Sequence, residues 1–308
     1  MFAKSAKNIN CYLIDGPDIF VARERFPLSD VAQMKVGNKP VDGGNYLFTH
    51  QERNDFLQIE PEADEFFIKW YGSKEYLNGI RRWCLFVQQI PEESLSSMPE
   101  TRKRIQNVRE FRQASSSKPT QAIADRPMNF HVETFPENIF LVVPKVSSER
   151  RPYIPVGYLK TDSLASDLLN VVADAGIYIF AIISSKLHMC WIKTVRGRMK
   201  TDYRYTAGLC YNTFPFPELN ATQRSELEGH VFNVLDQREA WPEKTLAELY
   251  DPDTMPDSLR EAHHQMDLAV EQCYRKKPFT SDAERLAYLF RMYEQMIETK
   301  KTAEAANA

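Results

Sequence analysis

The chain has 308 residues, of which 43% are apolar and 26% are charged, and its formal net charge at pH 7 is −3. This composition is typical of a globular protein with one large domain or two ordinary ones. No run of 18 apolar residues occurs, which excludes a membrane-spanning helix, and the five widely spaced cysteines favour reduced core residues over disulfides or a metal site.

Charge is unevenly distributed along the chain. Residues 218–308 contain 11 Lys and Arg against 18 Asp and Glu, whereas residues 1–217 contain 28 against 24. A basic first part joined to an acidic second part is compatible with nucleic-acid binding by the first part alone. The first residues lack the apolar segment of a secretory signal, so we expect a cytoplasmic protein.

The first two hundred residues combine short strands with helices. In chain order, the apolar and turn patterns predict a strand or strand pair at 9–20, a glycine-rich loop at 36–45, helices at 50–59 and 61–70, a strand at 83–87, a basic helix at 98–114, strands at 140–144, 171–172 and 177–183, and a helix at 184–195. Because these elements do not follow a regular βαβ order, they predict an α+β fold with a mixed sheet rather than a doubly wound one.

After Pro217 the pattern changes to helices alone. Apolar residues at helical spacing predict helices over about 222–240 and 257–274 and from 280 onward. The sequence therefore divides into a mixed-sheet domain at 1–217, with its core at about 20–217, and an all-α domain at 218–308.

The motifs of common enzyme classes are missing. The sequence contains no GxGxxG or phosphate-binding loop, no Gly-x-Ser-x-Gly and no HExxH. His188 and Cys190 lie on one predicted helix, where core packing explains them better than a nucleophile pair does. The adjacent His263 and His264 are expected on the surface. The sequence thus predicts a binding module with no catalytic residue and no metal site of its own.

Residues 196–205 form a basic segment whose composition is the most informative of the chain. It combines four cations with one carboxylate, namely Arg196, Arg198, Lys200, Arg204 and Asp202. In an extended segment the charged residues from 198 to 204 share one face, and Tyr203 and Tyr205 point to the other. Such a face fits a phosphate backbone or the acceptor edge of guanine. A solvated ribbon edge whose charges block unwanted strand pairing would have the same pattern.

Several longer motifs stand in series around this segment. They are Met-x-x-Gly-Asn-Lys-Pro-x-Asp-Gly-Gly at 34–44, Arg-Trp-Cys-Leu at 82–85, Pro-x-Val-Ser-Ser-Glu-Arg-Arg-x-Tyr-Ile-Pro at 144–155, Gly-Arg-x-Lys-x-Asp-Tyr-Arg-Tyr at 197–205, Tyr-Asn-x-Phe-Pro-Phe-Pro at 211–217 and Leu-Tyr-Asp-Pro-x-Thr-Met-Pro at 249–256. In this order they resemble the C-terminal part of the MmeI-like DNA methyltransferases. These are class I S-adenosylmethionine-dependent adenine-N6 enzymes of restriction–modification systems, some fused to a nuclease.

The resemblance covers nearly the whole chain and implies a target recognition domain at 1–217 and a C-terminal helical domain at 218–308. The family's catalytic Asn-Pro-Pro-Tyr/Phe and its glycine-rich cofactor motif are absent from this sequence. We therefore expect an excised half or a separately encoded subunit, not catalytic alone, with S-adenosylmethionine bound by the missing catalytic domain. The implied partners are double-stranded DNA at the prokaryotic nucleoid and that catalytic domain or subunit.

The resemblance also assigns base-reading residues. Lys200 and Asp202 match a pair whose identity follows one base pair downstream of the methylated adenine, and Arg204 resembles a second base-reading position. A lysine can donate to guanine O6 and N7, and an aspartate can accept from cytosine N4. We therefore expect a G:C pair at that position, with guanine on the strand of the adenine.

The remaining predicted contacts go to the DNA backbone, where they orient the duplex without reading it. These residues are Arg196, Arg198, Ser147, Ser148, Arg150, Arg151 and Lys39. Two alternatives stay open: Arg150 and Arg151 could form a structural ion-pair cluster with Glu149, and Lys39 could only shape the joint to the catalytic domain. The alternative function is a protein-interaction subunit that does not bind DNA.

Overall fold

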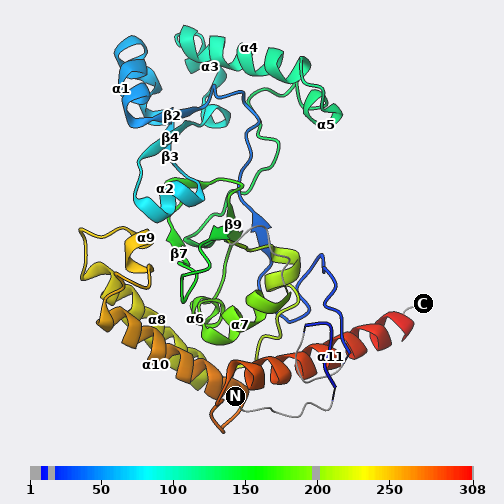
Figure 1. Cartoon of the computed structure of the whole chain (residues 1–308). Coiled ribbons are helices and arrows are strands. Elements are labelled where there is room, and N and C mark those ends of the chain that lie inside the picture. The colour runs from blue at the N-terminus through cyan, green and yellow to red at the C-terminus, as the bar shows by residue number, and fades with distance from the viewer. Residues whose placement is uncertain (1–7, 13–17, 196–201, 307–308) are drawn as a thin grey trace. The chain divides into compact units, whose positions relative to one another are not determined.

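The structure, a computed structural model, describes residues 8–12, 18–195 and 202–306 (Figure 1). These residues form two compact units. The strand-rich unit comprises Lys35–Val142 and Tyr158–Val171. The helical unit comprises the described residues up to Met34, Val143–Gly157 and those from Val172 onward. The mixed sheets and the helices together confirm the predicted α+β fold.

The strand-rich unit contains most of the strands. Its elements are β1 (Met34–Val36), β2 (Leu47–Thr49), α1 (His50–Ile59), η1 (Pro61–Phe66), β3 (Phe67–Tyr71), α2 (Ser73–Asn78), β4 (Arg82–Leu85), η2 (Val87–Gln89), α3 (Glu92–Leu95), α4 (Pro99–Gln113), α5 (Lys118–Gln121), β5 (Phe140–Pro144), β7 (Gly157–Leu159), β8 (Ser163–Ala165) and β9 (Leu169–Val172). Strands β1, β5, β7 and β9 reach the boundary of the unit at one end.

Two four-stranded sheets organise this unit. One has the order β2-β4-β3-β8, in which β4 pairs antiparallel with β2 and β3, and β8 pairs parallel with β3. The other has the order β1-β9-β5-β7. Buried aromatic side chains such as Phe48, Phe67 and Trp70 fill the core beside the first sheet. The sheet is therefore mixed, as predicted.

Local sequence explains where α1 begins. Thr49 Oγ accepts from the Glu52 amide at 3.2 Å, and Glu52 Oε2 accepts from the Thr49 amide at 2.7 Å, which is a complete capping box. The helix predicted at 50–59 is confirmed. The helix predicted at 61–70 is wrong beyond Phe66, because Phe67 and Trp70 are drawn into the sheet core as part of β3. The strand predicted at 9–20 is not present in the described residues 8–12 and 18–20.

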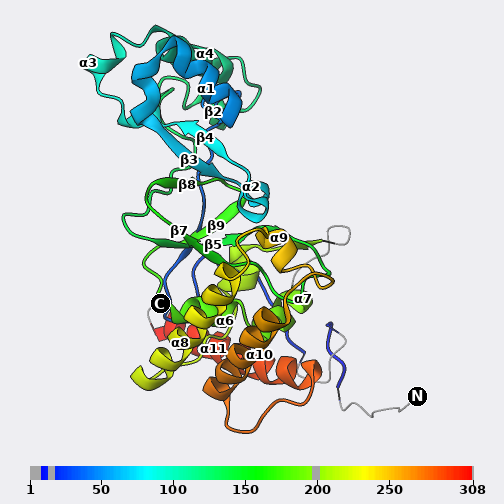
Figure 2. The same ribbon diagram turned by 90° about the vertical axis from the view of Figure 1, so that its left-hand side faces the viewer.

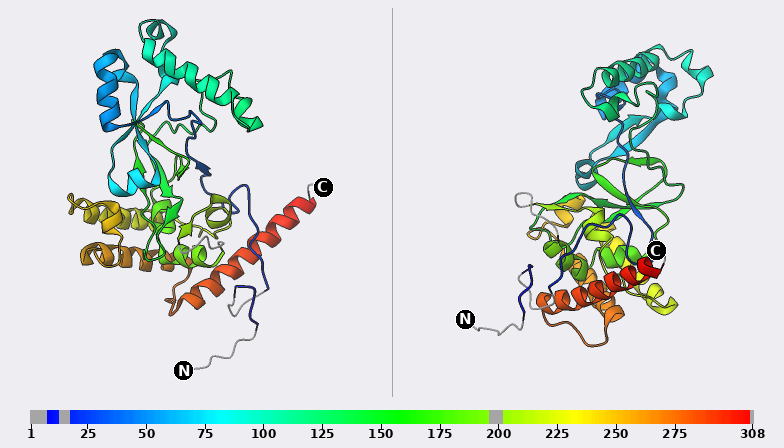
Figure 3. Two further views of the ribbon diagram at one scale, coloured as in Figure 1. Left: turned by 45° about the horizontal axis from the view of Figure 1, so that its top comes forward. Right: turned by 90° about the vertical axis from the view of Figure 1, so that its right-hand side faces the viewer.

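The helical unit contains most of the long helices. Its elements are β6 (Val146–Ser147), α6 (Tyr178–Ile183), α7 (Lys186–Val195), β10 (Tyr203–Arg204), η3 (Ala207–Tyr211), α8 (Ala221–Glu239), α9 (Leu246–Leu249), α10 (Asp257–Tyr274) and α11 (Asp282–Ala306). Helices α8 and α10 run side by side (Figure 2). Helix α11, the longest helix of the described residues, is the red helix that leads to the C-terminus (Figure 3), and it packs against α7.

The core of the helical unit is aromatic. The Trp191 ring lies 5.3 Å from Phe290 and 6.2 Å from Phe214 between centroids, so α7, α11 and the 214–217 segment meet there. The buried strand predicted at 177–183 is wrong, since this run forms α6, in which residues 179–183 are all buried. A short apolar run that is covered on all sides has no periodicity to separate strand from helix. Among the described residues, no helix is long and apolar enough to cross a membrane.

Candidate nucleic-acid interface

Part of the basic segment forms a two-stranded ribbon in the helical unit. Strand β10 pairs antiparallel with β6, and Tyr203 lies opposite Ser147. We call this strand pair the ribbon. Asp202 and Arg204 are exposed, whereas Tyr203 and Tyr205 are buried. The predicted alternation of charged and aromatic faces is therefore confirmed for residues 202–205.

Helix α7 anchors the buried face of the ribbon. The Tyr205 hydroxyl lies 2.9 Å from His188 Nε2, and the His188 ring packs edge-on against Phe214. Burial lowers the pKa of His188 to about 3, so this histidine is neutral at physiological pH. Burial likewise raises the pKa of the Cys190 thiol to about 12. The predicted packing role of both residues is confirmed, because neither has the ionisation or exposure that a nucleophile needs.

The three cations of the segment that precede the ribbon, Arg196, Arg198 and Lys200, lie outside the part of the chain that the structure describes. Their neighbours are described: Val195 ends α7, and Asp202 leads into β10. The structure therefore gives the two ends of the segment and the orientation of Asp202 and Arg204.

The connection from residue 147 to residue 156, which we call the basic turn, follows β6. Ser148 Oγ accepts from the Arg150 amide at 3.3 Å, which fixes the start of the turn. Ser147 is only 2% exposed, and Arg151 Nη1 lies 3.5 Å from its hydroxyl. Burial lowers the pKa of Arg151, while the carboxylates of Asp251 and Asp202 oppose that shift. The ribbon and the basic turn therefore share one electrostatic environment.

Arg150 has a carboxylate partner in the structure, though it is not Glu149. Its Nη2 lies 2.5 Å from Asp253 Oδ2, in the loop between α9 and α10, and both side chains are more than half exposed. This ion pair raises the pKa of the Arg150 guanidinium. An exposed pair of this kind contributes little to stability, so Arg150 remains available to another anion.

Side chains from the C-terminal helices reach the far end of the basic turn. The Tyr153 hydroxyl donates to Asp267 Oδ2 at 2.7 Å, and its ring stacks on His263 with 4.2 Å between centroids. His263 Nε2 lies 2.8 Å from the Tyr250 hydroxyl, which accepts from Arg238 Nε at 2.7 Å. These five residues form a buried polar chain that spans α8, α9, α10 and the turn.

Sequence reasoning missed this polar chain. His263 was expected on the surface, but it is fully buried, and burial lowers its pKa well below the ordinary value. Burial also raises the pKa of the Asp267 carboxyl to about 6. A usable signal was the spacing, because His263, Met266 and Asp267 fall on one face of a helix with the apolar Leu259.

Lys39 lies on a tightly held loop of the strand-rich unit. Its side chain is exposed, and its amide donates to the Val132 carbonyl at 3.0 Å. Gly37 allows a close backbone approach, since a Cβ there would lie 2.2 Å from the Ser166 carbonyl oxygen. Gly43 and Gly44 have φ values of 60° and 82°, which confirms the predicted glycine-dependent turn.

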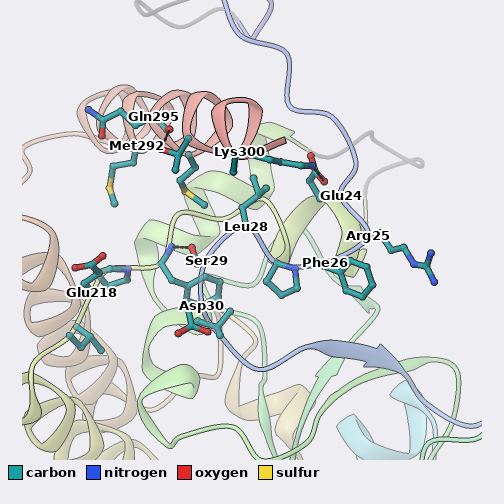
Figure 4. Close-up of a pocket in the computed structure, with 18 of the residues that line it drawn as sticks. Glu24, Arg25, Phe26, Leu28, Ser29, Asp30, Glu218, Met292, Gln295 and Lys300 are labelled. Atoms are coloured by element: carbon teal, nitrogen blue, oxygen red, sulfur yellow. Dashed lines mark hydrogen bonds and ion pairs between the residues drawn. The ribbon is translucent and has the colours of Figure 1, made fainter. Parts of the chain in front are cut away.

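A cavity of about 1120 Å³ lies elsewhere in the helical unit (Figure 4). It is bordered by residues 24–31, by the 216–219 segment and by the last turns of α11. Lys300 and Glu24 form an ion pair of 2.7 Å at its edge. None of the predicted site residues that the structure describes lines this cavity, so its lining does not coincide with the predicted interface.

Comparisons with known proteins agree with one another. Residues 15–218 match the target recognition domain of MmeI, and residues 219–300 match the C-terminal domain of MmeI. DNA methyltransferase A of Bacillus subtilis (strain 168) is 44% identical over 295 residues, which cover 96% of this chain and 33% of that protein.

A solved structure is also similar along nearly the whole chain. The type IIL restriction–modification enzyme MmeI in complex with DNA superposes with a TM-score of 0.91 and 39% sequence identity, over 96% of this chain and 40% of that one. The chain thus spans between a third and two fifths of the length of these relatives. It belongs to the MmeI family, of which it comprises the target recognition domain and the C-terminal domain.

Proposed function

We propose that this chain recognises DNA sequence for a DNA adenine-N6 methyltransferase of a restriction–modification system. The observation that carries the proposal is the ribbon. The charged Asp202 and Arg204 are exposed there, the alternating Tyr203 and Tyr205 are buried, and the cations of the basic turn follow the paired strand β6. Membership of the MmeI family and the likeness to an MmeI enzyme solved with DNA support it. Residues 1–217 would act as the recognition domain and residues 218–308 as a helical support.

Base reading is assigned to the exposed face of the ribbon segment. Lys200 donates to O6 and N7 of a guanine on the strand of the methylated adenine, and Asp202 accepts from N4 of the paired cytosine. Arg204, two residues further along the same face, reads a second position. Each such contact discriminates against the wrong base by roughly 1–3 kcal/mol.

Backbone contacts orient the duplex on this face. Arg150 and Arg151 from the basic turn, together with Arg196 and Arg198, neutralise phosphates, and Ser148 adds a hydrogen bond. We assign the buried Ser147 to the support of Arg151, because its own hydroxyl is covered. Lys39, exposed on its loop in the strand-rich unit, contributes one further phosphate contact.

Methyl transfer itself belongs to a catalytic methyltransferase domain or subunit, which would bind S-adenosylmethionine. The target adenine must leave the base stack to react, so the duplex has to be held in a fixed register while the base is flipped. This chain supplies that register. Because its partner is chromosomal DNA, we place its action at the nucleoid in the prokaryotic cytoplasm.

An exchange of charges tests the base assignment. In the protein joined to its catalytic domain, Lys200→Glu with Asp202→Arg moves the donor and the acceptor to opposite strands. Methylation should then shift from sites with G:C to sites with C:G at the position downstream of the adenine. The measurement is methylation of duplexes that carry each of the four base pairs at that position.

The chain contains its own matched control. Lys160-Thr-Asp162 repeats the tripeptide Lys200-Thr-Asp202 on an exposed turn of the strand-rich unit. The same exchange there, Lys160→Glu with Asp162→Arg, should leave the preferred base pair unchanged. Retention of the original preference by the 200/202 exchange, or a change of preference caused by the 160/162 exchange, would contradict the assignment.

A further inference from the structure

One buried carboxylate joins the two segments that carry the proposed DNA contacts. Asp267 Oδ2 accepts from the Tyr153 hydroxyl of the basic turn at 2.7 Å. Asp267 Oδ1 accepts from the Lys186 amide at the first residue of α7, also at 2.7 Å. Asp267 is 4% exposed; its bond to Tyr153 is buried, and its bond to the Lys186 amide is partly buried. A single side chain of α10 thereby fixes the basic turn relative to α7.

The same turn of α7 holds the ribbon. His188, two residues after Lys186, lies against the Tyr205 hydroxyl beneath β10. The connection therefore runs from the ribbon through Tyr205, His188 and α7 to Asp267, and from there through Tyr153 to the basic turn. The bonds at Tyr205 and at Tyr153 are buried, and the bond between Asp267 and the Lys186 amide is partly buried.

A second anchor secures the end of the basic turn. Arg238 of α8 donates through Nη1 to the Val156 carbonyl at 2.7 Å and through Nε to the Tyr250 hydroxyl. Tyr250 in turn contacts His263, whose ring stacks on Tyr153. Residues 153 and 156 are thus both tied to the C-terminal helices, while Arg150 and Arg151 stand at the other end of the turn.

The polar character of these anchors is informative. Apolar packing would tether the turn at lower desolvation cost, because burying a carboxylate and a guanidinium is unfavourable unless each is hydrogen-bonded. Hydrogen bonds, unlike apolar contacts, are directional and fix one geometry. A buried polar chain at this place fits a requirement for a defined distance between the phosphate-binding turn and the base-reading ribbon.

We propose that Asp267 and Tyr153 are positioning residues for DNA recognition, which hold the basic turn in register with the ribbon. The inference rests on the proposed function and deepens it. It gives the C-terminal helical domain a role in recognition, although its own net charge is acidic. Phosphate contacts made by Arg150 and Arg151 then orient the duplex correctly for the residues on the ribbon.

A double-mutant cycle tests this role. The affinity of the full chain for a fluorescent random-sequence duplex is measured for Tyr153→Phe, for the pair Arg150→Gln and Arg151→Gln, and for all three changes together. Tyr153→Phe keeps the ring on His263 but removes the bond to Asp267. It should weaken binding about three- to tenfold in the natural background and cause no further loss once both arginines are replaced.

Tyr288→Phe is the matched control. It also removes one tyrosine hydroxyl of the helical unit, which donates to the Tyr274 carbonyl at 2.7 Å away from the basic turn. Thermal unfolding of each variant shows that it is folded. Tyr288→Phe should lower the melting temperature about as much as Tyr153→Phe does and leave duplex affinity unchanged.

The outcomes separate this inference from the proposed function. A natural protein without salt-sensitive duplex binding would refute the proposed function and this inference with it. Salt-sensitive binding that is weakened by the arginine changes, but equally reduced by Tyr153→Phe in both backgrounds, would refute only the positioning role.

As a second test, Asp267→Asn, which can accept only one of the two bonds, should reduce discrimination between base pairs at the Lys200/Asp202 position about threefold or more. Unchanged discrimination would contradict a link between turn and ribbon.

Discussion

Two loops with proposed DNA contacts, the Lys39 loop and the basic turn, are each held by a buried arginine, but by different means. In the strand-rich unit, Arg112 donates to five backbone carbonyls, those of Pro40, Val41, Ile123, Arg126 and Asn129. In the helical unit, Arg238 donates to one carbonyl and to the Tyr250 hydroxyl, which passes the connection on to His263. Backbone carbonyls are present whatever the side chains are. The Lys39 loop is therefore fixed by backbone geometry, and the basic turn by the identity of several side chains.

The largest expected effect is at Arg112. Replacing this buried arginine with Met leaves five backbone carbonyls without their donor, so we expect the free energy of unfolding to fall by about 3–5 kcal/mol. Urea unfolding of the full chain measures this loss. Arg102→Met, on the exposed face of the same helix α4, is the control and should change stability by no more than about 0.5 kcal/mol.

Arg238→Met sharpens the contrast between the two loops. Because it deprives one carbonyl and one hydroxyl of their donor, we expect a smaller loss of stability, about 2–3 kcal/mol. Arg238→Met should also weaken duplex binding, because it loosens the basic turn. A folded Arg112→Met variant should weaken duplex binding only through the phosphate contact of Lys39. A stability loss at Arg238 as large as that at Arg112 would remove the distinction between the two ways of holding a loop.

Buried titratable groups of the helical unit predict acid sensitivity. The pKa values of His188 and His263 are lowered by burial, so below about pH 6.5 the unfolded chain binds protons that the folded chain does not. Each histidine should therefore reduce the free energy of unfolding by about 1.4 kcal/mol per pH unit as the pH falls. Burial raises the pKa of Asp267 to about 6, so below that pH the folded chain binds a proton there that the unfolded chain does not yet bind. This uptake stabilises the folded chain on acidification and offsets the loss of stability from one histidine.

Substitutions separate these contributions by sign. Between about pH 6 and pH 4.5, His188→Gln should make the loss of stability on acidification shallower, by about 1.4 kcal/mol per pH unit. Asp267→Asn should make it steeper by a similar amount, because the opposing proton uptake is lost. Urea unfolding at successive pH values measures both slopes. Identical slopes in the two variants would mean that these groups do not control the acid response.

The contrast between the loops also explains what could be predicted from sequence. The Lys39 loop was predictable, because Gly43 and Gly44 signal its backbone conformation locally. The exposure of Asp202 and Arg204 was likewise predictable from strand alternation. The polar chain behind the basic turn was not, since it joins Tyr153 to Asp267 across 114 positions and depends on tertiary packing.

Burial accounts for the main errors in the predicted fold. The 177–183 run is apolar throughout, so its periodicity could not show that it forms helix α6. Phe67 and Trp70 fit a helical spacing as well as a strand, and the sheet core decided between them. Helices with one apolar face, such as α1 and α10, were placed correctly to within a residue or two.

The smallest expected effect concerns Asp253. It tests whether Arg150 is free to bind phosphate or is held in place by Asp253. If Arg150 binds phosphate, its ion pair with Asp253 competes with DNA, and Asp253→Asn should strengthen duplex binding about two- to fivefold at low salt with little change in stability. If Asp253 instead positions Arg150, as Asp267 positions Tyr153, the same substitution should weaken binding. Asp162→Asn, which releases Lys69 from a similarly exposed pair in the strand-rich unit, is the control and should leave affinity unchanged. Stronger binding would mean that the Arg150 guanidinium leaves Asp253 to bind a phosphate. Only the far end of the basic turn, at residues 153 and 156, would then be rigidly held.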